Sequence, residues 1–223
     1  MKNTRSILAV DKAYFENGFC RPLYDSYCFS RIPATILRLL TGKETGGLPK
    51  DVDSGGIYDV VILFFLDGFG WRFLEKYASS YPFLQRFLEQ GIVSKITSQF
   101  PSTTAPHVTC MNSNLTVGQS GVYEWFYYEP KVDAMIAPLL FSYAGDKKTG
   151  TLKNAPIAPE AIYPTRTFYQ ELKEEGIASY VMQDEQIAHS DYSKVLFHGA
   201  HNVSFSSLED SLIHLQDLYE QTM

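Results

Sequence analysis

The chain has 223 residues, and 45% of them are hydrophobic, which is enough for one substantial domain with a buried core. Nineteen Lys and Arg against 25 Asp and Glu give a formal net charge of −6 without a long run of either sign. This balance provides no basic patch for nucleic acid or for an anionic membrane. Three cysteines without Cys-x-x-Cys or zinc-finger spacing, and apolar stretches too short for a signal peptide or a membrane span, lead us to expect a soluble, cytoplasmic protein.

The first 56 residues alternate aromatic, polar and turn-forming residues around one helix-like segment, IPATILRLLTG, which Gly42 ends. We interpret residues 1–56 as an N-terminal extension packed on a core formed by residues 57–223. The core begins with YDVVILFFLDGFG at 58–70. Its apolar, partly β-branched run predicts a central strand that is buried on both faces of a parallel sheet.

Helical spacing follows from Trp71 to Gln90, with an interruption near Pro82 and a stop at Gly91. Residues 92–96 (IVSKI) predict the next strand, and a second helix is expected to begin inside PSTTAPH at 101–107. This βαβα order is typical of layered α/β proteins with right-handed crossovers. We therefore expect a three-layer α/β/α fold with a mostly parallel central sheet.

The rest of the chain continues this alternation. Residues 122–165 are rich in aromatic side chains and predict an irregular, lid-like segment. TRTFYQELKEEG predicts a helix capped by Gly176, and IASYVM predicts a strand. Residues 206–223 have the spacing of an amphipathic helix, with Leu208, Leu212, Leu215 and Tyr219 on one face. No closing strand follows, so the predicted α/β alternation is unfinished.

Asp67 ends the first predicted strand, and the loop SQFPSTTAPH leaves the second. Ligands of open α/β sheets bind at the carboxyl ends of the strands, so we expect the two segments to lie close together. Asp67-Gly68 also suits an ordinary turn, and the hydroxyls of PSTTAPH also suit a helix cap. A divalent metal on a threonine oxygen would favour the alkoxide, and a helix start would stabilise a phosphoryl group.

The segments LDGFG (66–70), FPSTTAPHVT (100–109) and GQSGVYEW (118–125) together resemble the alkaline phosphatase superfamily, specifically its type I phosphodiesterase/nucleotide pyrophosphatase branch. The resemblance implies an alkaline-phosphatase-like fold and two divalent metal ions, expected to be zinc, whose remaining ligands we expect beyond residue 223. It also implies that Asp67 is a metal ligand and that Thr104 is both the metal-bound nucleophile and a ligand. Ser102 and Thr103 are then caps or spacers.

Two departures from the family pattern stand out. No Asn matches the family's phosphoryl-contacting Asn near Glu124 and Trp125, and the chain has no Asp-His pair for a second metal. Asp210 and His214 have the spacing of a ligand pair, but we interpret them as part of a solvent-exposed helix face. His107 is expected to pack or to hydrogen-bond, and the remaining histidines are weak candidates on a polar stretch: His189, His198 and His201.

We therefore expect the N-terminal portion of a longer enzyme, a metal-dependent hydrolase of phosphodiesters or nucleotide pyrophosphates acting on small phosphoester or nucleotide substrates. A phosphomonoesterase or phosphonate hydrolase of the same superfamily is a close variant, whose pocket shape residues 123–128 would set. A non-catalytic fragment or pseudoenzyme is the alternative from a different class. A metal-free nucleotide-binding domain is disfavoured because neither Gly-x-Gly-x-x-Gly nor a P-loop occurs.

Overall fold

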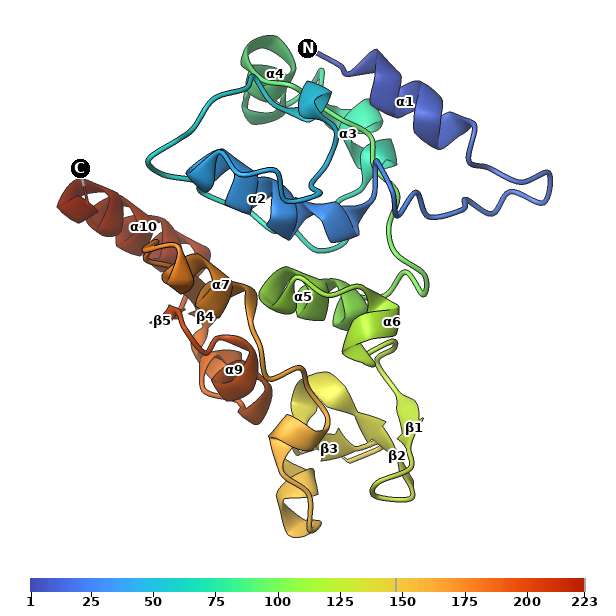
Figure 1. The fold of residues 1–223 in the computed structure, drawn as a ribbon, viewed down its shortest axis with the longest axis vertical. Helices are drawn as coiled ribbons and strands as arrows, with labels where there is room; N and C mark the ends of the chain where they lie inside the picture. Colours follow the sequence, from blue (N-terminus) through green and yellow to red (C-terminus); the bar gives the residue numbers. More distant parts are fainter. Residues whose placement is uncertain (147, 223) are drawn as a thin grey trace. The chain divides into compact units, whose positions relative to one another are not determined.

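The structure is a computed structural model that describes residues 1–146 and 148–222. Lys147, within the predicted lid-like segment, and Met223, at the end of the predicted terminal helix, lie outside the described residues. The chain divides into two compact units, Met1–His107 and Val108–Met223, and each is described by itself (Figure 1). The predicted extension 1–56 lies inside the first unit together with residues 57–107. Its role as a separate extension stays a prediction.

Short helices make up most of the regular structure of the first unit. They are α1 (Thr4–Asp11), η1 (Phe29–Arg31), α2 (Ile32–Thr41), η2 (Lys50–Val52), α3 (Trp71–Tyr77), α4 (Pro82–Gln90) and the start of α5 (Thr104–Ser113). The predicted end of α2 is confirmed, because Gly42 follows it in the left-handed conformation at φ 72°. The predicted break between α3 and α4 is confirmed too, with Pro82 in the first turn of α4.

The predicted strand at 92–96 is wrong. Val93 and Thr97 form only isolated parallel bridges, to Lys2 and Cys28, and no strand is assigned there. The Thr97 hydroxyl also accepts a hydrogen bond from the Leu23 backbone N–H at 2.9 Å. The segment therefore ties the N-terminal residues to the first unit without forming a ladder.

The predicted buried strand at 58–66 is also wrong. The segment has no regular secondary structure, and Phe64 and Leu66 are each 58% exposed. Its contacts include a backbone hydrogen bond from Tyr58 to Leu39 and a ring contact of Phe65 with Phe29 at 5.4 Å. Apolar periodicity indicates which side chains need burial, but a strand also needs partners on its edges. The described residues of the first unit supply no ladder for it.

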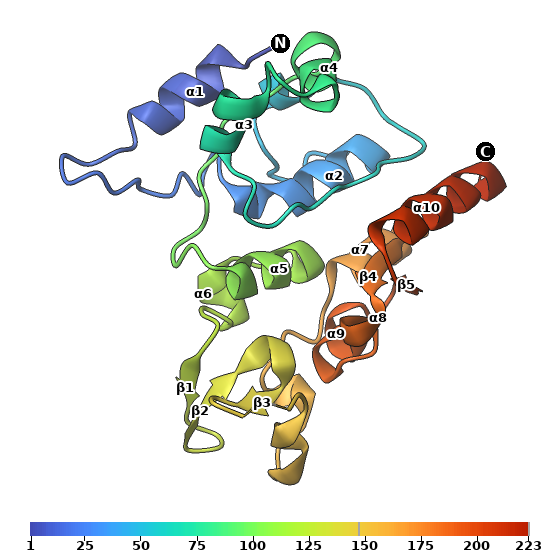
Figure 2. The same ribbon diagram turned by 180° about the vertical axis from the view of Figure 1, so that it is seen from behind.

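The second unit contains two small sheets and several helices (Figure 2). Its helices are α6 (Val117–Ser120), η3 (Pro138–Leu140), η4 (Thr151–Asn154), η5 (Pro159–Ala161), α7 (Phe168–Glu174), α8 (Glu185–Ala188), α9 (Asp191–Leu196) and α10 (Leu208–Thr222). Its strands are β1 (Tyr127–Glu129), β2 (Ala134–Ala137), β3 (Ser142–Tyr143), β4 (Tyr180–Asp184) and β5 (His201–Phe205).

The predicted lid-like segment 122–165 is more regular than expected. Its strands form an antiparallel sheet in the order β1-β2-β3, in which Ile136 lies opposite Tyr127 on one side and Tyr143 on the other. Ile136, Phe141 and Leu152 are almost completely buried and form the centre of this part. The segment therefore has its own apolar core, and its role as a lid stays a prediction.

Strands β4 and β5 pair in parallel, with α8 and α9 between them in the chain. The prediction of a strand at 177–182 is confirmed with a small shift to β4, and Gly176 follows α7 at φ 78°, as predicted for its cap. Mixed helices and strands agree with an α/β protein. However, the sheets among the described residues are small, so the expected large parallel sheet is not found in this part of the chain.

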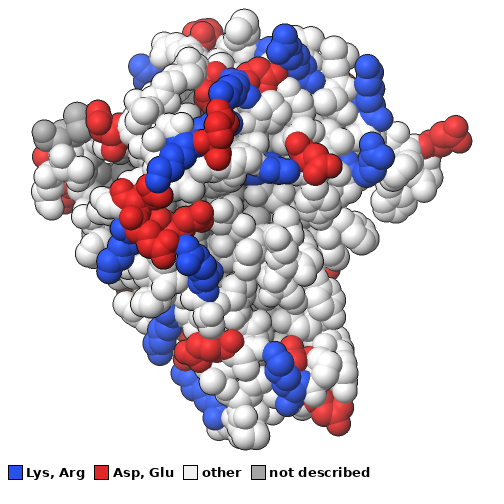
Figure 3. Space-filling view, in the orientation of Figure 1, with Lys and Arg blue, Asp and Glu red and all other residues white. Residues whose placement is uncertain are grey.

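The terminal helix is confirmed as α10, but its apolar face is exposed. Leu208, Leu212 and Tyr219 are 75%, 49% and 47% exposed. Over the described residues, no helix combines the length and apolar character that crossing a bilayer requires. On the face that Figure 3 shows, basic and acidic side chains are interspersed.

Candidate functional site

The structure brings the side chains of Asp67 and Thr104 together. Thr104 Oγ1 donates a hydrogen bond to Asp67 Oδ2 at 3.2 Å, although the two residues are 37 positions apart in the sequence. Thr104 is the first residue of α5. Asp67 stands in a tight turn whose next residue, Gly68, has a φ of 70°, a conformation that glycine adopts without strain. A carboxylate, a hydroxyl and a helix start therefore meet in the first unit.

The loop that leads into α5 is fixed by His107. The Gln99 backbone N–H donates to His107 Nε2 at 2.9 Å, so this ring nitrogen is the acceptor. Nδ1 then carries the proton and donates to the Thr103 carbonyl oxygen at 2.7 Å. The edge of the imidazole also meets the ring of Phe29 at 4.7 Å. These contacts fix the backbone immediately before Thr104.

Burial lowers the pKa of His107, against the smaller opposing effects of the Thr103 hydrogen bond and the Asp67 carboxylate. The folded chain therefore favours the neutral imidazole. Because both ring nitrogens already have partners, neither is free to bind a metal ion. His107 thus has the hydrogen-bonding role that the sequence predicts.

Buried hydroxyls hold the later turns of α5 within the second unit. Thr109 Oγ1 and the Tyr192 hydroxyl lie 3.0 Å apart, and the Tyr169 hydroxyl donates to Asn112 Oδ1 at 2.7 Å. Burial raises the pKa of Tyr192 to about 12, so its proton stays in place at neutral pH. These bonds join α5 to α7 and α9. Removing one partner of either bond would leave the other partner buried without a hydrogen bond, which destabilises the fold.

Asp67 and Thr104 offer a divalent cation two oxygen-bearing side chains. A zinc site in a protein usually has at least three protein ligands. Across residues 1–146 and 148–222, no group of three or more His, Cys, Asp or Glu side chains is placed to hold a metal ion. The described residues therefore do not complete the metal centre that the resemblance implies.

The Asp210 and His214 pair has another use. Asp210 Oδ1 lies 3.0 Å from His214 Nε2, while Asp210 Oδ2 accepts hydrogen bonds from the backbone and the hydroxyl of Ser206. The Ser206 bonds are the main cause of the lowered pKa of Asp210, and His214 contributes less. The Ser207 hydroxyl accepts the N–H of Asp210 in return. The carboxylate therefore helps to cap α10 on a solvent-accessible face.

The remaining histidines are not gathered into a cluster with acidic or thiol groups among the described residues. His201 stacks on Tyr180 across the β4–β5 pair, with ring centroids 5.0 Å apart. The His198 carbonyl oxygen accepts a hydrogen bond from the Thr167 hydroxyl. Both contacts belong to the packing of the second unit.

Sequence reasoning missed the backbone partners of His107. Many sequences have a histidine three residues after a helix start and a polar residue on the preceding loop. This pattern therefore does not indicate that the Gln99 N–H and the Thr103 carbonyl are the partners of the imidazole. It also missed that the Thr103 hydroxyl is buried without a hydrogen-bond partner among the described residues.

A family model matches residues 61–190, a range that includes Asp67 and Thr104 and covers 130 of the 223 residues. The match places the chain in a hydrolase family. The chain belongs to the type I phosphodiesterase / nucleotide pyrophosphatase family. Searches of the curated proteins and of the solved structures gave no match.

Proposed function

We propose that the chain carries the nucleophile of a metal-dependent hydrolase of phosphodiesters or nucleotide pyrophosphates. The observation that supports this proposal is the hydrogen bond between Thr104 and Asp67 at the first residue of α5, inside the range that the family model matches. We assign Thr104 as the nucleophile and Asp67, together with Thr104, as ligands of a divalent metal ion such as zinc.

The chemistry assigned to this chain takes place at Thr104 Oγ1. This oxygen loses its proton to solvent and attacks phosphorus, and the bond from phosphorus to the leaving-group oxygen breaks, so that the leaving group departs with a proton from solvent. Water later attacks phosphorus and releases the remaining phosphate monoester, which restores the threonine hydroxyl. Asp67 orients the hydroxyl through the observed hydrogen bond, and the positive end of the helix dipole at the start of α5 favours a negatively charged group nearby. A bound divalent ion would lower the pKa of the Thr104 hydroxyl and would neutralise negative charge on the phosphate oxygens.

A non-catalytic member of the family is the second candidate. It is favoured because the described residues contain no group of three or more His, Cys, Asp or Glu side chains that could hold a metal ion. Such a protein would keep the helix start and the turn without holding a metal ion. The two candidates differ in whether the natural full-length protein turns over a phosphoester when zinc or manganese is present.

The test uses the natural full-length protein with zinc or manganese and bis(p-nitrophenyl) phosphate. Phosphate monoester and phosphonate ester analogues distinguish the close enzymatic variants. We expect Thr104→Ala to lower turnover on the order of a thousandfold, because the nucleophile is removed. Ser102→Ala, an exposed hydroxyl two residues earlier, is the matched control and should keep wild-type turnover. Equal turnover by Thr104→Ala and wild type would refute the nucleophile, and no turnover by the wild type under any of these conditions would favour the non-catalytic candidate.

A further inference from the structure

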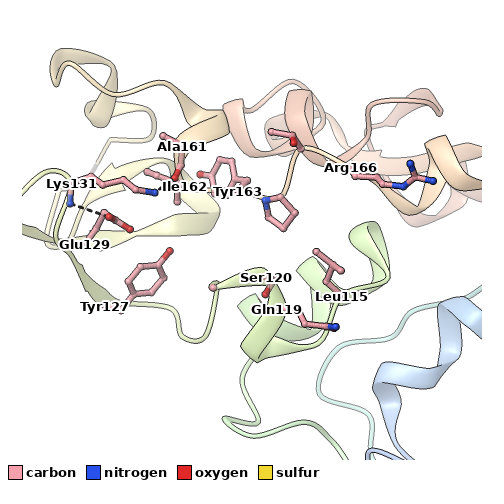
Figure 4. A pocket seen from close by; sticks show the side chains of 13 residues that line it. Leu115, Gln119, Ser120, Tyr127, Glu129, Lys131, Ala161, Ile162, Tyr163 and Arg166 are labelled. Carbon is pink, nitrogen blue, oxygen red and sulfur yellow. Dashed lines mark hydrogen bonds between the residues drawn. The ribbon is translucent and has the colours of Figure 1, made fainter.

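The second unit contains a cavity of about 470 Å³ between α6, β1 and residues 161–166 (Figure 4). This volume is within the usual range of small-molecule sites. Figure 4 shows three walls: the side chains of β1 and the following turn, the side chains of residues 161–163, and α6 with Leu115. The lining includes polar side chains that can form hydrogen bonds or ion pairs with a ligand, among them Gln119, Tyr127, Glu129, Lys131 and Arg166.

Tyr127 directs an unused hydroxyl into this cavity. Its side chain is 4% exposed, and its ring stacks on Tyr123 with centroids 4.5 Å apart. No hydrogen bond joins the hydroxyl to another described residue, and Figure 4 shows it pointing into the space between β1 and residues 161–163. Burial, with smaller effects of Glu129 and Tyr123, raises the pKa of Tyr127, so the group keeps its proton. Among the described residues, the side-chain polar atoms that are buried without a partner are Asp51 Oδ1, Thr103 Oγ1 and Ser179 Oγ, so the Tyr127 hydroxyl meets solvent in the cavity, where a ligand can replace its water.

Glu129 adds a buried acceptor on the same face of β1. It lies two residues from Tyr127, so both side chains point the same way from the strand, and it is 9% exposed. One carboxylate oxygen accepts the Lys131 backbone N–H at 3.0 Å. A carboxylate has further lone pairs, and these can accept the hydroxyl groups of a ligand.

The cationic groups of the cavity already have partners within the protein. Lys131 Nζ donates to the Ala161 carbonyl oxygen, and Arg166 forms an ion pair with Glu174 at 2.7 Å. Tyr163 donates its hydroxyl to the Pro138 carbonyl oxygen, so it offers the cavity mainly a ring. The lining therefore contains two cationic side chains and one carboxylate, with Arg166 paired to Glu174 outside the lining, and it presents the hydroxyls of Tyr127 and Thr165 and aromatic surface.

We infer that this cavity binds a neutral polyhydroxylated molecule of the size of a monosaccharide or cyclic polyol. Ligand hydroxyls would donate to Glu129 and exchange hydrogen bonds with Tyr127, while the carbon face of the ligand packs against the tyrosine rings. Lys131 and Arg166 already contact Ala161 and Glu174, so an inorganic anion would have to compete with these contacts and would also meet the Glu129 carboxylate. The inference depends on contacts of the second unit and does not rest on the proposed function.

The test is a titration of the 223-residue chain with myo-inositol, D-glucose and D-ribose, followed by ligand-observed NMR and calorimetry. Tyr127→Phe removes the hydroxyl and keeps the ring, so binding should weaken roughly fivefold, the effect of one uncharged hydrogen bond. Glu129→Gln should weaken binding further, because an acceptor is replaced in part by a donor. Tyr128→Phe is the matched control. Tyr128 is 50% exposed on the opposite face of β1, and its hydroxyl donates to Asp133. The Tyr128→Phe variant should therefore bind the polyol with the affinity of the wild type.

Inorganic phosphate and glutamate serve as charged comparison ligands. The inference is supported if at least one polyol binds, both charged molecules bind more weakly, and Tyr127→Phe alone of the two tyrosine variants reduces affinity. Absence of polyol binding, stronger binding of phosphate or glutamate, or unchanged affinity of Tyr127→Phe would each overturn it. Matching thermal unfolding midpoints of Tyr127→Phe and Tyr128→Phe would show that a lost affinity is not a lost fold.

Discussion

Replacing His107 by Phe tests how the start of α5 is fixed. The phenyl ring keeps most of the volume and the edge contact with Phe29, but it removes both hydrogen bonds of the imidazole. The Gln99 N–H loses this acceptor in a buried position, at a cost of about 1–3 kcal/mol, and the lost bond to the Thr103 carbonyl adds about 1 kcal/mol. We therefore expect the free energy of unfolding to fall by roughly 2–4 kcal/mol in urea titrations.

The same residue predicts a pH dependence of stability. The folded-state pKa of His107 is lowered from 6.5, so the unfolded chain binds the proton more readily than the folded chain. Stability should therefore be full above pH 6.5 and fall as the pH drops below 6.5 toward the folded-state pKa. His107→Phe should lose this part of the pH dependence, whereas His214→Phe, on the exposed side of α10, should keep it. A loss below 0.5 kcal/mol and an unchanged pH profile in His107→Phe would refute this account.

Two further substitutions test other parts of the first unit. Gly42→Ala places a Cβ in the left-handed conformation and 2.7 Å from Ile57 Cδ1, so we expect a loss of about 1–2 kcal/mol in urea unfolding; a neutral result would contradict the assigned backbone conformation. Arg38→Met leaves the Asp53 carboxylate, 2.6 Å away and mostly buried, without its partner, and we expect a loss of about 2–4 kcal/mol. Lys50→Met, whose side chain is 76% exposed, is the matched control and should leave the unfolding midpoint unchanged.

Elements with local signals were predicted well from the sequence. Gly42 and Gly176 end helices through their own backbone freedom, and Pro82 starts one through its fixed φ, so neighbouring residues suffice to place α2, α4 and α7. Strands were not predicted equally well. The segment 58–66 has the composition of a buried strand, but pairing depends on residues far along the chain, and the described residues form their parallel ladder between β4 and β5 instead.

The candidate site shows the same difference. The prediction that Asp67 and Thr104 lie close together agrees with the structure, but the reason given for it does not, since the sheet edge that was expected to join them is not formed. A turn at Gly68 and the start of α5 bring the two side chains together. The cavity beside Tyr127 was not predicted. Its walls come from residues 115–131 and 161–166, and local sequence patterns do not indicate that these two segments lie side by side.

The central claim is that Thr104 becomes covalently phosphorylated during turnover. The most direct measurement is acid quenching of the natural full-length protein during turnover of bis(p-nitrophenyl) phosphate with zinc or manganese, followed by peptide mass spectrometry. The account predicts a p-nitrophenyl phosphate ester on the threonine at position 104, since one nitrophenol leaves in the first step. This adduct should be absent from Thr104→Ala and reduced in Asp67→Asn, which loses the carboxylate that accepts its hydrogen bond. An adduct on Thr103 or Ser102, or turnover without any adduct on this segment, would contradict it.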